Sequence, residues 1–136
     1  MTVKEYYTDA CCRHQYNIFS WAVVTPHHQY CGVVHRNNLH TFFSELFAVG
    51  RALMIAKKDD GDVIIYCDNQ GVVNWLNKEE DEFLMQFGNS RESELLCRTY
   101  YFYKFCPNVR IRKISRNLNR IADSVARRTL RDAEEW

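Results

Sequence analysis

The chain has 136 residues, of which 46% are hydrophobic, and this fits one globular domain over residues 1–136 with a proper core. The formal net charge is only +1, so the molecule as a whole is not an electrostatic nucleic-acid binder, and any such surface must be a local patch. The uncharged runs are too short to cross a bilayer and the N-terminus lacks the apolar core of a signal peptide. We therefore expect a soluble, intracellular protein, either cytoplasmic or nuclear.

The pattern of apolar and turn residues predicts nine elements. They are strands at 4–12, 17–25 and 29–36, a helix at 41–58, a strand ending at Asp68, helices at 70–77 and 90–105, a strand at 109–114 and a helix at 118–131. The polar stretch 78–89 reads as a loop. This order predicts an α/β fold with a mixed five-stranded sheet, antiparallel at the first three strands and parallel where helices intervene, flanked by helices.

Six cysteines are scattered through these elements without the paired spacing that zinc modules use. In a reducing compartment we expect them to be free, buried thiols. The aromatic run at 100–105 could be mistaken for a base-stacking platform, but its helical spacing favours core and helix-packing surface.

Asp68 is the most informative residue, because it ends a run that has no charge between Asp62 and itself. Such a run predicts a central strand buried on both faces, and the carboxyl ends of strands are where ligands gather in open α/β sheets. A structural alternative stays open from this motif alone, since Asp68 could cap the helix that begins near Gln70.

Three further acids lie near surfaces predicted to pack. Asp9 lies within the first strand, and Glu45 lies in a helix that is apolar on most sides. Asp123 flanks a stripe with spacings of three and four, formed by Leu118, Ile121, Ala122, Val125 and Ala126. Four carboxylates at packed surfaces need a compensating charge, and a divalent cation is the usual one.

Together these residues resemble ribonuclease H of type 1, which carries an Asp in its first strand, a Glu in its first helix, an Asp ending its fourth strand and an Asp in its last helix. The likeness spans nearly the whole chain. The motifs that carry it are Tyr7-Thr8-Asp9-Ala10, Ser44-Glu45-Leu46, Tyr66-Cys67-Asp68-Asn69-Gln70-Gly71 and Asn119-Arg120-Ile121-Ala122-Asp123, the last in the form common among retroelement reverse transcriptases.

The resemblance implies a ribonuclease H-like fold and a metal-dependent endonuclease that hydrolyses the RNA strand of RNA/DNA hybrids with two Mg²⁺ or Mn²⁺ ions. Asp9 and Asp68 would then touch both ions or bridge them. Glu45 would bind the ion nearer the leaving group, and Asp123 the ion that activates water. The partner would be a hybrid nucleic acid, for a free-standing protein or within a larger reverse transcriptase or polymerase assembly.

The chain also departs from the family pattern. Many members carry a His in a loop before the last helix, but here no His follows His40. Arg116 lies in the corresponding shortened loop and could hold a phosphate. Thr41, Phe42 and Phe43 stand where an Asn often contacts the hybrid, and residues 78–94 are acidic where some members have a basic helix.

Substrate contacts are expected from Gln70, which could bond a base edge or ribose in the minor groove, and from Arg116, Asn119 and Arg120. Arg110, Arg112 and Lys113 extend this basic cluster. Two alternatives remain open: a non-catalytic domain that uses the fold to bind nucleic acid or protein, and a related DNA nuclease on the same fold.

Overall fold

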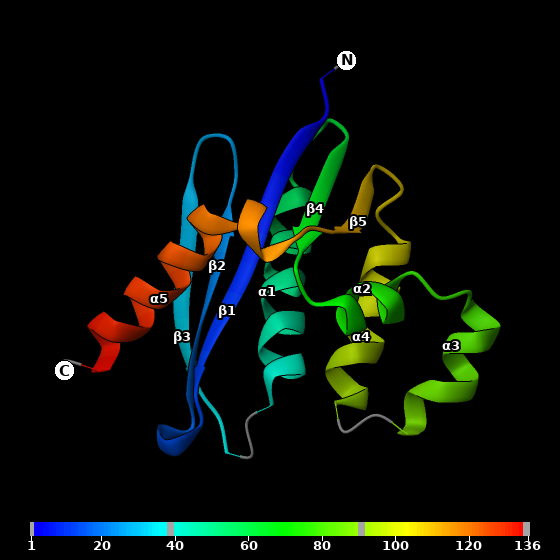
Figure 1. Cartoon of the computed structure of the whole chain (residues 1–136). Coiled ribbons are helices and arrows are strands. Elements are labelled where there is room, and N and C mark those ends of the chain that lie inside the picture. The colour runs from blue at the N-terminus through cyan, green and yellow to red at the C-terminus, as the bar shows by residue number, and fades with distance from the viewer. Residues whose placement is uncertain (1, 38–39, 90–91, 135–136) are drawn as a thin grey trace.

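The computed structural model of the chain describes residues 2–37, 40–89 and 92–134. At its centre is a five-stranded sheet in the order β3-β2-β1-β4-β5 (Figure 1). The strands are β1 (Lys4–Arg13), β2 (Ile18–Val24), β3 (Gln29–His35), β4 (Val63–Cys67) and β5 (Val109–Lys113). The first three pair with one another in antiparallel fashion, and β4 and β5 run parallel to β1. The predicted mixed sheet is therefore confirmed.

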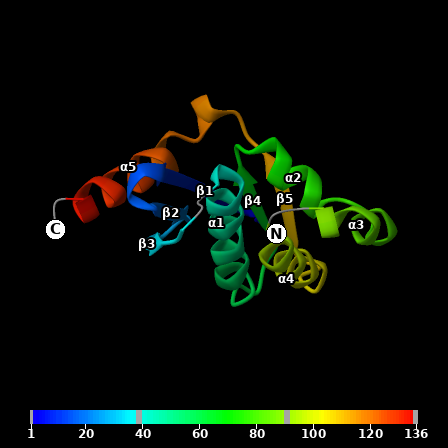
Figure 2. The same ribbon diagram turned by 90° about the horizontal axis from the view of Figure 1, so that it is seen from below.

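Helices cover both faces of the sheet unequally (Figure 2). The long helix α1 (Thr41–Ala56) packs on one face with α2 (Gln70–Leu76) and α4 (Ser93–Lys104), and they enclose the main core with β1, β4 and β5. On the other face α5 (Arg120–Glu134) packs against β1, β2 and β3 around a smaller core. Short 3₁₀ turns occur at η1 (His14–Tyr16), η2 (Phe87–Asn89) and η3 (Arg116–Leu118).

Strand β4 is buried on only one face, which corrects the expectation of burial on both. Val63, Ile65 and Cys67 are buried against the main core, whereas Ile64 and Tyr66 on the opposite face are half-buried. The reason is the position of α5, because this helix covers the β1, β2 and β3 half of the sheet. The apolar run predicted the strand, but it did not predict which faces of the strand would be covered by helices.

The expected loop at 78–89 contains a helix instead, α3 (Glu80–Gln86), followed by η2. Its anchor is Phe83, which is fully buried and stacks on Tyr100 with ring centroids 3.8 Å apart. Acids in its first turn also favour the helix, because they complement the positive end of the helix dipole. The polarity that suggested a loop belongs to the exposed side of this helix.

The aromatic run of α4 contributes to the core, as predicted. Tyr100 is fully buried and its hydroxyl donates to the Lys78 carbonyl at 2.7 Å. The Tyr103 hydroxyl accepts from the Ile111 amide at 3.2 Å and so ties α4 to β5. Phe105 is the exception, with 84% of its surface exposed just after the helix ends.

The last helix begins at Arg120, two residues later than predicted, and its buried face differs from the expected stripe. Ala122, Val125 and Ala126 pack as expected, but Leu118 and Ile121 are 72% and 61% exposed. Leu118 belongs to the separate turn η3 and so is out of register with α5, and Ile121 lines an open pocket beside Tyr7.

All six cysteines are free, as expected, although they are not uniformly buried: Cys67 and Cys106 are buried and Cys31 is exposed. Among the residues that the structure describes, no helix has both the length and the apolar character needed to cross a membrane.

We predict that Phe83→Ala destabilises the protein by about 3–4 kcal/mol, because it removes the buried ring that holds α3 against α4. Urea unfolding followed by circular dichroism measures the change. Met85→Ala on the same helix is the matched control, since Met85 is 83% exposed and its loss should alter stability by less than about 0.5 kcal/mol. Equal effects of the two substitutions would show that Phe83 does not anchor α3.

Candidate metal centre

The site lies where β1 and β4 part. Their parallel pairing runs from Lys4 and Val63 to Tyr7 and Tyr66 and then stops, so Asp9 lies beyond the paired region. Side chains replace the missing ladder bonds: the Thr8 hydroxyl donates to the Tyr66 carbonyl at 2.9 Å, and Asn119 Nδ2 donates to the Thr8 carbonyl at 2.8 Å. These two bonds link β1 to the end of β4 and to Asn119 beside the opening.

Asp68 does not cap the helix that follows it. The N-cap of α2 is Asn69, whose Oδ1 accepts from the Val72 amide at 3.0 Å. The structural alternative for Asp68 is thus excluded, and its half-buried carboxylate instead accepts a long bond of 3.4 Å from Asn119 Nδ2. Asn69 turns the chain while Asp68 faces the opening.

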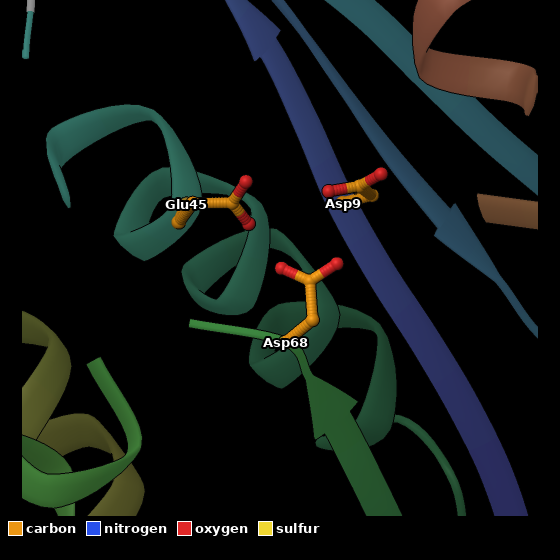
Figure 3. Close-up of side chains that lie close together, drawn as sticks. All are labelled: Asp9, Glu45 and Asp68. Carbon is orange, nitrogen blue, oxygen red and sulfur yellow. The ribbon is translucent and has the colours of Figure 1, made fainter. Parts of the chain in front are cut away.

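Three carboxylates converge in this opening (Figure 3). Asp9 from β1, Glu45 from α1 and Asp68 from the end of β4 each place an oxygen within 4.8 Å of the others. Asp9 and Glu45 are each only 5% exposed. Glu45 reaches the site because its helix packs deeply against the sheet, with Leu46 and Val49 in the core.

Burial and the charges of neighbouring acids disfavour the charged forms of Asp9 and Glu45. Burial is the main cause that raises the pKa of Asp9 to about 7, and the charge of Asp68 adds to it. Burial also raises the pKa of Glu45 well above its usual range, and the charges of Asp9 and Asp68 contribute further. Asp9 and Glu45 therefore hold protons near neutral pH more readily than ordinary carboxyls do, and a bound cation would displace those protons.

Asp123, the fourth predicted acid, lies at the rim of this cluster. It lines the same pocket and contributes to the raised pKa of Asp9, but both of its oxygens accept from Arg127 Nε, at 3.0 and 3.1 Å. Arg127 is one turn further along α5, so this is an ordinary ion pair on a helix surface. The structure thus brings three acids tightly together and holds the fourth against an arginine.

The chemistry of the pocket fits a divalent cation. Its volume is about 260 Å³, and its walls offer carboxylate oxygens, the hard ligands that Mg²⁺ and Mn²⁺ prefer. Glu45 Oε2 is buried and has no hydrogen-bond partner among the described residues. A buried oxygen left without a donor is rare in folded proteins, and a cation would satisfy it.

The expected substrate contacts are distributed unevenly. Arg116 lines the acidic pocket, and Gln70 is exposed at the start of α2, where its Nε2 donates to Asn74 at 2.7 Å. Asn119 is only 1% exposed, and its Nδ2 donates to the Thr8 carbonyl and to Asp68, so it helps to hold the site in place. Arg120 lines a neighbouring pocket instead.

Sequence reasoning missed other residues of the pocket wall, among them Cys11 and Cys12. Burial raises the pKa of the Cys12 thiol, whose sulfur lies 3.0 Å from the Ser44 hydroxyl. No sequence motif identified these residues, because they line the pocket only as a result of how α1 packs against β1.

Known proteins share this fold. A family model described as "Reverse transcriptase-like" matches residues 7–129. The LC11 ribonuclease H1 isolated from compost aligns with a TM-score of 0.74 and 19% identity, over 98% of this chain and 99% of that one. Ribonuclease H1 from the halophilic archaeon Halobacterium salinarum NRC-1 aligns with a TM-score of 0.69 and 20% identity, over 96% of this chain and 99% of that one.

The prototype foamy virus protease-reverse transcriptase gives a TM-score of 0.73 and 19% identity, over 93% of this chain but only 20% of the viral one. The compost enzyme and a foamy viral protease-reverse transcriptase have also been solved in complex with an RNA/DNA hybrid. No curated protein matches this chain by sequence. The match to the family model covers most of the sequence, and the chain therefore belongs to the reverse-transcriptase-like family and has the ribonuclease H fold.

Proposed function

We propose that the protein is a metal-dependent endonuclease that hydrolyses the RNA strand of RNA/DNA hybrids. The observation that carries the proposal is the convergence of Asp9, Glu45 and Asp68, with their oxygens within 4.8 Å of one another. A cluster of like charges removed from water costs free energy, so such a cluster needs a functional reason. Metal-dependent hydrolysis of a phosphodiester supplies one, because the metal ions need carboxylate ligands held close together. The hybrid complexes of two structural neighbours support this choice of substrate.

Each acid would have a distinct task in holding two Mg²⁺ or Mn²⁺ ions. Asp9 and Asp68 would contact both ions, Glu45 would hold the one near the leaving oxygen, and Asp123 the one near the attacking water. Bound there, the ions would supply an activated water and neutralise charge on the phosphate. Arg127 would keep the Asp123 carboxylate oriented before the metal ions bind, since it contacts both oxygens of that carboxylate.

Arg116 is the proposed phosphate ligand. It is exposed and lines the acidic pocket from the loop where many family members have a His. A guanidinium stays charged at neutral pH, so it can hold a phosphate but cannot transfer a proton. We therefore propose that the absence of the His slows turnover without abolishing cleavage. A place within a larger reverse transcriptase or polymerase assembly is part of the same proposal.

We predict that Asp68→Asn lowers hybrid cleavage by about 1,000-fold or more, because it removes a shared metal ligand. The assay compares labelled RNA/DNA hybrid, double-stranded RNA and duplex DNA with Mg²⁺ and with Mn²⁺. Asp60→Asn is the matched control, since Asp60 is exposed outside the site. Failure of the folded wild type on all three substrates would favour the non-catalytic binding domain, and cleavage of duplex DNA alone would favour the DNA nuclease.

The raised pKa of Asp9 predicts how stability depends on pH without metal. A carboxyl whose pKa is higher in the folded than in the unfolded state binds more protons when folded. The free energy of unfolding therefore falls as pH rises from the unfolded pKa through the folded pKa. For Asp9 these two pKa values are 3.8 and about 7. Thermal unfolding in EDTA should thus show a lower Tm at about pH 7.5 than at about pH 5.5, and Mn²⁺ should reverse the loss at the higher pH.

Asp9→Asn provides the control for this pH effect. It removes one of the titrating groups, so its Tm should change less between the two pH values than that of the wild type. An identical pH profile for the two proteins would show that Asp9 is not responsible.

Arg116→Ala should weaken hybrid binding and reduce the slope of log affinity against log salt by about 0.9, the value expected for one phosphate contact. Metal binding, measured by calorimetry with Mn²⁺, should be nearly unchanged. Arg131→Ala is the charge-matched control, because Arg131 is exposed near the far end of α5. If both variants keep the wild-type slope, Arg116 does not contact the substrate backbone.

A further inference from the structure

The sheet face opposite the main core is open over β4 and β5. Helix α5 covers the β1, β2 and β3 half of this face (Figures 1 and 2). Across the strands that remain, the register places Tyr7 opposite Tyr66 and Tyr66 opposite Arg112, so these three form one row. In the neighbouring row Arg110 lies opposite Ile64.

This open face carries aromatic and apolar surface. The Tyr7 and Tyr66 rings stack with centroids 5.3 Å apart and an interplanar angle of 21°. Beside Tyr7 a pocket of about 610 Å³ opens toward η3 and the start of α5, and Leu118 and Ile121 line it. These two side chains are 72% and 61% exposed, so nothing in the described part of the chain buries most of their surface.

Positive charge borders this apolar surface. Arg110 and Arg112 are exposed on β5, and Arg120 is exposed at the other side of the pocket. Glu5 is an acid on this face, and it hydrogen-bonds to Tyr66. The three arginines outnumber this acid, so the local charge is positive. Positive charge favours a polyanion and disfavours a second copy of this chain, since a second copy would bring arginines against arginines.

We propose that this open sheet face, formed by Tyr7, Tyr66, Arg110, Arg112, Leu118 and Ile121, binds single-stranded nucleic acid. Aromatic side chains between cationic ones are the arrangement that holds unpaired strands, because bases stack on the rings while phosphates meet the cations. The face borders the metal centre through Asn119, which lines its pocket and bonds to Asp68. An unpaired strand next to a hybrid would thus have a binding surface separate from the acids.

The test measures fluorescence anisotropy of labelled oligothymidylate and oligouridylate in EDTA, where no cleavage occurs. Tyr66→Ala should weaken binding by about fivefold or more, as expected for loss of one stacking platform. Arg112→Ala should lower the slope of log affinity against log salt by about 0.7, the single-strand value for one phosphate. Leu118→Glu is a third variant, on an exposed side chain whose replacement leaves the core intact, and it should weaken binding several-fold.

Matched controls lie away from this face. Tyr16 is 62% exposed in η1 and Arg98 is exposed on α4, so Tyr16→Ala and Arg98→Ala should bind like the wild type. Asp68→Asn should also retain single-strand binding, which separates this proposal from the proposed cleavage. Wild-type affinity in Arg112→Ala and Leu118→Glu would overturn the proposal. So would gel filtration that shows a wild-type dimer and a monomeric Tyr66→Ala, because the face would then be a self-association surface.

Discussion

Repulsion among three converging carboxylates, two of them buried and one half-buried, is the constraint around which this structure is arranged. Asp9, Glu45 and Asp68 are held within 4.8 Å by elements that cannot easily separate, since β1 and β4 are central strands and α1 is embedded in the core. The packing of these elements supplies the free energy that keeps the acids together. A bound cation would offset the repulsion between the acids. The arrangement that destabilises the metal-free protein therefore favours the binding of a cation.

The end of the β1–β4 ladder gives these acids their space. Once the pairing stops at Tyr7 and Tyr66, backbone groups need other partners, and Thr8 and Asn119 provide them. Asn119 precedes α5, so it connects this helix to β1 through Thr8 and to Asp68, which follows β4. The position of α5 and the geometry of the acids are therefore coupled through one buried amide.

Charge is distributed locally in a chain whose net charge is only +1. Negative charge is concentrated in the opening between the strands, and arginines surround it: Arg116 and Arg127 line the same pocket, while Arg110 and Arg112 extend along β5. A phosphate backbone can approach such an arrangement because the cations offset the repulsion from the acids at its centre. The overall composition conceals this pattern.

Sequence patterns determined the order of the strands and long helices and identified the acids, because apolar periodicity and turn residues are local properties. They did not reveal α3, whose formation depends on Phe83 meeting Tyr100 from another helix. Nor could they decide that Asn69 rather than Asp68 caps α2, that Asn119 is buried beneath the site, or that Asp123 pairs with Arg127. The open face of β4 was likewise hidden, since an apolar run does not say which strands a distant helix will cover. These features depend on contacts between residues far apart in sequence or on competition between neighbouring partners, and only the packed tertiary structure settles such contacts.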